Sequence, residues 1–528
     1  MTNPLTSLLI PRFCLLLLLI CCTSGLRAQL STSQIDQLVE QAMKKFNVVG
    51  ASVGIVKDGK IIHTKGYGFL SSKSKVKVNE HTQFAIASNS KAFTTAALAL
   101  LVEDGKISWT DKVKTHIPEF KMYNEYVTEN FNIQDLLTHR SGLGLGAGDL
   151  MFFPDGSDFT VKDVLSVFQH FSPQSAFRTK FDYDNLLYTV AGELIARVSS
   201  SSWEEFVEKR IIHPLNMDRS YTSLKGIKDK SNLANPHNTA SGTTQEFSNF
   251  VKTMNGAAGG IFSNADDLCN WMLVHLNKGK YGAKLDKKLF SEENQREMWK
   301  IHTSLNASRN PRYNAHFSGY GLGWFLTDIK GNMSVSHTGG LPGMLSKTIL
   351  IPDLKLGVVV LTNTEPGGGE LFSAVTQTIV DSYLGLDDYN WTDHYAKLAQ
   401  ESKGEADSVS GKVWETVRTA NQKAFNPQDY TGVYEDKWFG KVEVFMKNEQ
   451  LWIRSYRSPK LNGAMQYYKA NAFAVKWAYQ DMNADALAIF SLDEEGKAQR
   501  IQMKGISPDI DFSFDFQDLD LRRVKSTR

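Results

Sequence analysis

The sequence of 528 residues contains little cysteine. Three of its four cysteines, Cys14, Cys21 and Cys22, fall within the first 28 positions, and Cys269 is the fourth. A chain that keeps Cys269 alone cannot form an internal disulfide. Its stability must then come from a hydrophobic core, which about 500 residues can supply.

An excess of charge is also missing, because 59 Lys and Arg residues are balanced by 57 Asp and Glu residues. The formal net charge of +2 gives no strongly basic field for nucleic acid, and no polybasic cluster marks a membrane-surface protein. Hydrophobic residues make up 42% and charged residues 22% of the chain, which is ordinary globular usage. We therefore expect neither a nucleic-acid partner nor a disordered or multi-span membrane chain.

A hydrophobic run long enough to cross a membrane is not evident at the N-terminus. Arg12 precedes an apolar run over residues 13–22, and small and polar residues follow it as far as Ala28. This order is typical of a secretion signal, whereas a membrane span needs roughly twenty apolar residues. The sequence therefore predicts a signal peptide over residues 1–28, a secreted or periplasmic protein and no stable membrane span.

The rest of the chain divides into three parts. Residues 29–386 have strand patterns at both ends, at 51–67 and 346–361, with a long, mostly helical stretch between them. This order predicts an α+β fold in which an antiparallel sheet is flanked by helices and carries a mostly helical insertion. The polar residues 387–425 are expected to form a helical linker.

Residues 426–528 show apolar residues with a period of two, which is typical of strands. Turn signals separate short segments of this kind, so we predict a small antiparallel β-barrel of seven or eight strands. Its core is expected to include Val442 and Val444 and the alternating residues Ile510, Phe512, Phe514 and Phe516.

The first segment that carries chemistry is Ser88-x-x-Lys91, at the start of a strong helical pattern. Residues three apart lie on one face of a helix, with about 5–6 Å between their Cβ atoms. A serine hydroxyl becomes a good nucleophile when a neighbouring group takes its proton, and a helix N-terminus offers free N–H groups to developing negative charge. The pattern is nevertheless common by chance, and a capping serine beside a solvated lysine also explains it.

The second segment is Tyr183-x-Asn185, directly before a helical pattern. A tyrosine can relay a proton as phenol or phenolate. The Asn185 amide can hold a substrate carbonyl or orient Lys91. Taken alone, a capping asparagine beside a core tyrosine explains this segment as well. His139 is interpreted as a hydrogen-bonded loop histidine.

The third segment is His337-Thr-Gly339-Gly340, which we expect at the end of a strand. Glycines let a substrate backbone approach the strand closely, and the Gly340 N–H can face an oxyanion. His337 can orient Tyr183 or a substrate group. An ordinary glycine-rich turn is the alternative interpretation.

Together and in this order, the three segments resemble the serine β-lactamase and penicillin-recognising enzyme superfamily, and most of all its class C-like branch of esterases and D-aminopeptidases. The segments 135–143, 257–263 and 319–324 are similar to that branch too, and the likeness covers roughly residues 35 to 385. Residues 426–528 resemble the lipocalin-like appendage of some relatives.

The resemblance implies that Ser88 is the acylated nucleophile, Lys91 its partner and Tyr183 the general base. Substrate binding would use Asn185 together with His337, Gly339 and Gly340, and the oxyanion hole would use the N–H groups of Ser88 and Gly340. No metal or cofactor is implied. The partner would be a small molecule or a short peptide.

One position departs from class C β-lactamases, which carry lysine where this chain has His337. A histidine with a pKa near 6.5 is mostly neutral at pH 7, so the anchor for a β-lactam carboxylate is weaker. This difference favours an ester or a peptide amide as substrate. A cell-wall D,D-peptidase, a β-lactamase and a non-catalytic binding protein on the same scaffold remain alternatives, and the sequence leaves open the oligomeric state and the role of the barrel.

Overall fold

A computed structural model describes residues 29–251, 254–422, 425–480 and 483–525. The predicted signal peptide over residues 1–28 lies outside the described residues. Among the helices of the described part, none is both long enough and apolar enough to span a membrane.

An eight-stranded antiparallel sheet forms the centre of the larger unit, in the order β2-β1-β14-β13-β12-β11-β10-β9. Strands from the two ends of this unit lie side by side, because β1 pairs with β14. The strands are β1 (Gly50–Lys57), β2 (Lys60–Gly68), β9 (Thr303–Leu305), β10 (Ser318–Tyr320), β11 (Phe325–Ile329), β12 (Asn332–Leu341), β13 (Met344–Ile351) and β14 (Leu356–Thr362). This arrangement confirms the predicted sheet.

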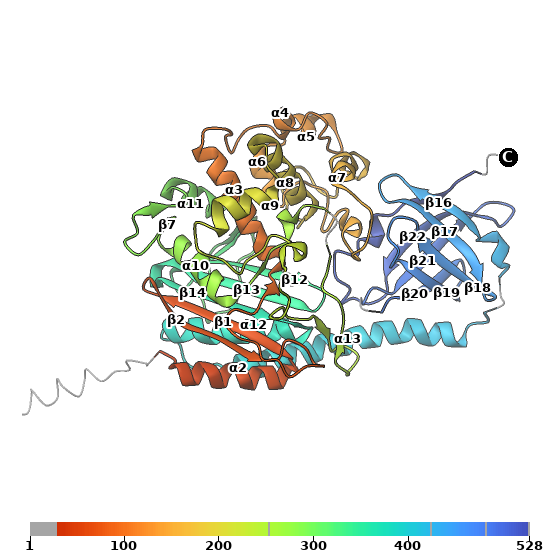
Figure 1. The fold of residues 1–528 in the computed structure, drawn as a ribbon. Helices are drawn as coiled ribbons and strands as arrows, with labels where there is room; N and C mark the ends of the chain where they lie inside the picture. The colour runs from red at the N-terminus through yellow and green to blue at the C-terminus, as the bar shows by residue number, and fades with distance from the viewer. Residues whose placement is uncertain (1–28, 252–253, 423–424, 481–482, 526–528) are drawn as a thin grey trace, which may run out of the picture.

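Helices cover both faces of the sheet (Figure 1). On one face lie α2 (Thr32–Phe46) and α12 (Gly367–Tyr383), which pack against each other. On the other face, α10 (Ala265–Leu276) packs on β1 and β14. Because β14 is buried along its whole length, its sequence is a continuous apolar run instead of an alternating one.

The insertion between the outer strands is largely helical and stands above the sheet in Figure 1. Its longest helices, α3 and α8, pack against each other. The helices of the insertion are α3 (Ser90–Glu103), α4 (Val113–His116), α5 (Glu125–Asn130), α6 (Ile133–Leu137), α7 (Val161–Val167), α8 (Leu186–Ser199) and α9 (Trp203–Val207), and α11 (Glu292–Met298) follows α10.

A single long helix, α13 (Trp391–Thr419), leads from the larger unit to a closed barrel (Figure 1). The barrel strands are β16 (Gly432–Asp436), β17 (Gly440–Lys447), β18 (Gln450–Ser455), β19 (Asn462–Lys469), β20 (Ala472–Trp477), β21 (Ala486–Leu492), β22 (Ala498–Gly505) and β23 (Leu521–Arg523). Strand β16 pairs with β23 and closes the barrel. The antiparallel C-terminal barrel predicted from the sequence is therefore confirmed.

One expectation about the barrel is wrong. The alternating residues 510–516 are not a strand but a loop between β22 and β23, with a 3₁₀ turn at Phe516–Asp518. Phe514 and Phe516 are buried, as expected, whereas Phe512 is 37% exposed. Alternation of apolar residues over seven positions does not distinguish a strand from a loop whose aromatic rings are buried by another part of the chain.

Candidate active site

Ser88 lies in a 3₁₀ turn, Ala87–Asn89, that leads directly into α3. Within residues 82–101, all of them described, Ser88 alone is partly exposed while the others are buried. The preceding residue, Ala87, has a φ of 48°, which a residue with a Cβ atom seldom adopts. Strain of this kind persists where the surrounding structure imposes it. The turn that contains Ala87 places Ser88 at the partly exposed start of an otherwise buried segment.

Lys91 is fully buried, and its ammonium nitrogen has three oxygen partners. Nζ lies 3.0 Å from Ser88 Oγ, 2.7 Å from Asn185 Oδ1 and 2.9 Å from the carbonyl oxygen of Ala258. The last two oxygens can only accept hydrogen bonds. A neutral amine at this position would donate its two hydrogens to them and direct its lone pair at the Ser88 hydroxyl.

Asn185 immediately precedes α8 and connects Lys91 to a buried carboxyl group. Its Oδ1 accepts from Lys91, and its Nδ2 donates to Asp149 Oδ2 over 2.8 Å. Burial raises the pKa of Asp149 to about 7, and the hydrogen bond from Asn185 acts in the opposite direction. Asn185 thus bonds Lys91 and Asp149 at once, and the two roles considered for it stay predictions.

The Tyr183 ring lies beside both Ser88 and Lys91. Lys91 Nζ is 4.8 Å from the centre of the ring, and the ring of His139 packs on it with centroids 4.1 Å apart. Burial raises the pKa of Tyr183 well above its usual value, while a hydrogen bond with Ser88 opposes this effect. Of the two forms considered, phenol and phenolate, the phenol is therefore favoured. His139 accepts from the backbone N–H of Asp184 at Nδ1, as a hydrogen-bonded loop histidine would.

The third segment lies inside β12, which continues through it to Leu341, so the strand does not end before the glycines. A Cβ atom on Gly339 would lie 2.1 Å from the Ile86 carbonyl oxygen and 2.5 Å from Ser346 Oγ. Glycine at this position lets β12 approach the turn that carries Ser88. Gly340 is exposed on the same strand, where an added Cβ atom would make only an ordinary contact with Leu345.

His337 is buried, and both of its ring nitrogens are bonded within the protein. Nδ1 lies 2.6 Å from the carbonyl oxygen of Thr338, and Nε2 lies 2.9 Å from the Tyr320 hydroxyl. Burial lowers the pKa of His337 to about 3, and the charge of Lys91 acts in the same direction. In this conformation both nitrogens are bonded within the protein, and the ring contacts Tyr183 with centroids 6.3 Å apart. The contact between His337 and a substrate stays a prediction.

Several residues around the site escaped the sequence analysis. Asp149 belongs to no short motif, and Tyr320 was noticed only within a supporting segment. Phe512 comes from the barrel, and its ring meets the ring of Tyr183 edge to face with centroids 5.7 Å apart. The aromatic residues at 510–516 were the one available signal, and their alternation was interpreted as a barrel strand.

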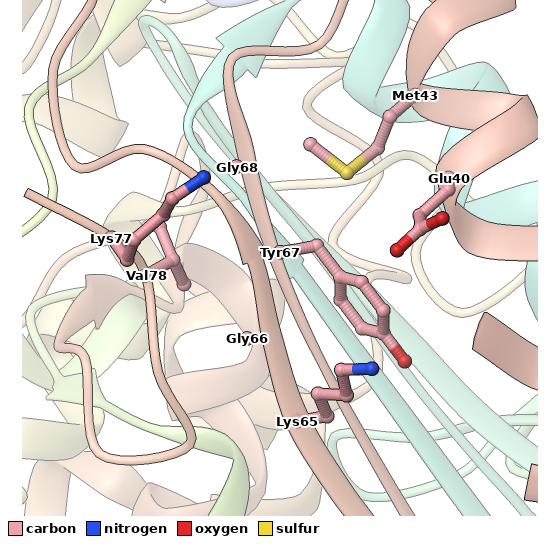
Figure 2. A pocket seen from close by; sticks show the side chains of 8 residues that line it. All are labelled: Glu40, Met43, Lys65, Gly66, Tyr67, Gly68, Lys77 and Val78. Atoms are coloured by element: carbon pink, nitrogen blue, oxygen red, sulfur yellow. The ribbon is translucent and has the colours of Figure 1, made fainter. Parts of the chain in front are cut away.

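A surface pocket of about 390 Å³ lies elsewhere, beside α2 and β2 (Figure 2). Its lining residues are Glu40, Met43, Lys65, Gly66, Tyr67, Gly68, Lys77 and Val78. In the order of the sheet, three strands separate β2 from β12. None of the three motif segments reaches this pocket. In the described part of the chain, no group of three or more His, Cys, Asp and Glu side chains is placed to hold a metal ion.

Comparisons with known proteins concern both units of the chain. The profile of the family described as Beta-lactamase matches residues 35–378, and the profile described as a domain of unknown function (DUF3471) matches residues 418–523. The second description carries no reference to lipocalins, so the lipocalin likeness of the barrel stays a prediction.

Protein flp of Staphylococcus aureus strain N315 is 29% identical over 340 residues, which are 63% of this chain and 63% of that protein. The chain thus spans less than two thirds of this relative's length. Unguisins hydrolase ungD' of Aspergillus campestris is 26% identical over 426 residues, 78% of each chain. The structure of the octameric penicillin-binding protein homologue from Pyrococcus abyssi shares the fold, with a TM-score of 0.59, 20% identity and coverage of 93% of this chain and 100% of that chain. Because the first family profile covers well over half of the sequence, the chain belongs to the beta-lactamase family.

Proposed function

We propose that the protein is a serine hydrolase that cleaves an ester or amide bond through an acyl-enzyme on Ser88. The observation that carries this proposal is the position of Lys91 Nζ, 3.0 Å from Ser88 Oγ and bonded to two oxygens that can only accept. This arrangement makes the lysine lone pair available to the serine hydroxyl and to no other of these three partners.

Acylation begins when the Ser88 hydroxyl transfers its proton to neutral Lys91 while Oγ attacks the substrate carbonyl carbon. The carbonyl oxygen becomes an oxyanion, for which the N–H groups of Ser88 and Gly340 are the proposed donors. Collapse of the tetrahedral intermediate breaks the bond to the leaving alcohol or amine. The leaving group receives a proton from the Tyr183 hydroxyl, and Tyr183 is in turn reprotonated from Lys91.

Deacylation runs through the same groups in the opposite sense. A water molecule gives its proton to neutral Lys91 and attacks the acyl carbon, and the protonated Lys91 then returns a proton to Ser88 Oγ as the bond between Oγ and the acyl carbon breaks. The hydrogen bond between Asp149 and Asn185 keeps the lysine in place during both steps, since Asn185 bonds both groups at once.

The substrate class is proposed from the third segment. A class C β-lactamase has a fixed cation there, whereas His337 is buried and its pKa is about 3. A neutral residue gives no attraction to a substrate carboxylate, which favours an uncharged ester or a peptide amide over a β-lactam. The D,D-peptidase alternative differs from the esterase only in its substrate and is decided by a substrate panel.

Labelling with a fluorophosphonate, read by intact mass, tests the proposal. We expect one adduct on the wild-type protein, no adduct on Ser88→Ala, and wild-type labelling of Ser166→Ala, which alters an exposed serine on α7. A well-folded wild-type protein that forms no adduct would contradict the proposal in favour of a binding protein. Esters, D-amino-acid amides and nitrocefin then divide the substrate classes, with the ester or amide series expected to react fastest.

We also propose that residues 1–28 direct export from the cytoplasm. The support is the apolar run over residues 13–22 with Arg12 before it and Ala28 after it. N-terminal sequencing of the protein from its native host should begin close to Gln29. A chain that still begins at Met1 in the cytoplasmic fraction would contradict this proposal.

A further inference from the structure

The barrel packs on the segment of the insertion that precedes and includes α7. Arg457 pairs with Asp158 and Asp163 at 2.7 and 2.9 Å, and Lys460 pairs with Asp155 at 2.6 Å. Aromatic rings add to this contact, with Phe153 of the insertion 6.3 Å from Phe514 of the barrel between centroids. The two units therefore share an interface of charged and aromatic side chains.

Asp515 lies within this interface and is fully buried. Its carboxylate accepts hydrogen bonds from the backbone N–H of Gly148 over 2.7 Å and from that of Leu150 over 2.8 Å. The residue between these two donors is Asp149, which accepts from Asn185, and Asn185 in turn accepts from Lys91. A continuous series of hydrogen bonds and one short piece of backbone thus connects the barrel with the proposed base.

Phe512 reaches the site from the same loop and remains 37% exposed. Its ring meets the ring of Tyr183 edge to face, and a Cβ atom on Gly146 would lie 2.7 Å from the Phe512 carbonyl oxygen. Gly146 has a φ of 72° and donates its N–H to the Tyr183 carbonyl oxygen over 2.7 Å. Glycine at this position thus lets the barrel loop approach the backbone that holds Tyr183.

We propose that the C-terminal barrel completes the active site: Asp515 is a positioning residue for Asn185 and Lys91, and Phe512 forms an apolar wall beside Tyr183 that binds an apolar group of the substrate. This inference rests on the proposed function and deepens it. The larger unit without the barrel would lack both residues, because loop 510–516 belongs to the barrel.

The charge next to Phe512 supports this assignment. Asp511 is exposed, and its negative charge is among the causes that raise the pKa values of Tyr183 and Asp149. The barrel loop therefore contributes to the electrostatics of the site as well as to its shape. An exposed carboxylate beside the wall also disfavours anionic substrates, in agreement with the neutral His337.

The role of Phe512 is tested with two series of esters, one that lengthens the acyl group and one that lengthens the alcohol. For Phe512→Ala we expect kcat/KM to fall about 10-fold or more for the bulkier members of one series and to change little for the smallest ester. Ile489→Ala is the matched control, since Ile489 is exposed to a similar extent on β21. Unchanged selectivity in both series would overturn this half of the proposal.

The role of Asp515 is tested by separating kcat from KM. Loss of position of the base by about 1 Å costs on the order of 10²-fold in rate, so Asp515→Ala should lower kcat about 10- to 100-fold with KM nearly unchanged. Gln517→Ala, at an exposed position of the same loop, should behave as wild type. Titration of active sites with the phosphonate measures the fraction of molecules with an intact site. A positioning role leaves this fraction unchanged, whereas partial unfolding lowers it.

Asp515→Asn provides a second measurement if Asp515→Ala does not fold. The asparagine oxygen keeps one of the two backbone hydrogen bonds, so an intermediate kcat is expected. A folded Asp515→Asn protein with the kcat of wild type would overturn the positioning role. These outcomes are distinct from failure of the proposed function, in which the wild-type protein itself would form no adduct at Ser88.

Discussion

The motif segments and the barrel loop both reach the candidate site, but different kinds of structure bring them there. Ser88 and Lys91 lie one turn apart at the start of α3, and Gly339 lies within β12. Phe512 and Asp515 lie in an irregular loop of a separate barrel. Regular elements impose a spacing that is visible in the sequence, whereas a loop that docks on another unit has no characteristic spacing.

The motif segments and the barrel loop are also held in place by different interactions. The motif segments are held by burial and by the backbone hydrogen bonds of their own helices and strands. The barrel loop is held by contacts with the insertion, such as the bonds from Gly148 and Leu150 to Asp515. Changes in the first region should therefore affect the chemistry directly, while changes in the second should act through position and selectivity.

The largest effect is expected for Lys91→Ala. Loss of the proposed base should reduce kcat by about 10³- to 10⁴-fold with a much smaller effect on KM. Lys106→Ala, at an exposed position just after α3, serves as the control and should keep wild-type activity. Steady-state kinetics on one ester are sufficient. If Asp515→Ala reduced kcat as much as Lys91→Ala, the barrel loop would not differ from the motif segments in the size of its effect on the reaction.

A smaller effect is expected for Gly339→Ala, which tests whether β12 must lie against the turn of Ser88. The new Cβ atom would overlap the Ile86 carbonyl oxygen, so the free energy of unfolding should fall by about 1–3 kcal/mol. Gly340→Ala has room beside Leu345 and should leave the free energy of unfolding nearly unchanged. Chemical denaturation of the two variants measures the difference. An equal free energy of unfolding for the two variants would mean that β12 does not pack closely against the turn that carries Ser88.

The last effect is that of acid on stability, and its sign should differ between the larger unit and the barrel. Burial lowers the pKa of His275 on α10 to about 3, while the unfolded value is near 6.5, so the unfolded chain binds the extra proton. This residue stabilises the fold above about pH 6.5, and its contribution is lost as the pH falls toward 3. Between pH 7 and pH 5 the loss is about 2 kcal/mol.

In the barrel, burial raises the pKa of Asp518 to about 6, so the folded chain binds the extra proton and the stability from this residue is lost as the pH rises through 4 to 6. Urea unfolding at pH 7 and pH 5 compares wild type with His275→Gln and Asp518→Asn. The first variant should lose less stability on acidification than wild type, and the second should lose more. Shifts of the same sign would contradict the opposite titration of His275 in the larger unit and Asp518 in the barrel.

The sequence alone determined the elements whose signals are local. The spacing of Ser88 and Lys91 follows from one helical turn, and the antiparallel strands of both units follow from their apolar patterns and turns. Tyr183 and Asn185 were recognisable because they lie directly before a helix. These features depend on neighbours within a few residues, which the order of amino acids specifies.

Only the tertiary structure decided which distant groups complete the site. Phe512 and Asp515 contact residues hundreds of positions away in the sequence, and Asp149 contacts Asn185 from 36 positions away. His337 turned out to be bonded within the protein. Burial from all sides also set the protonation of Tyr183 and His337. Contacts and burial of this kind arise from the packing of the insertion, the sheet and the barrel against one another, which no local pattern of residues encodes.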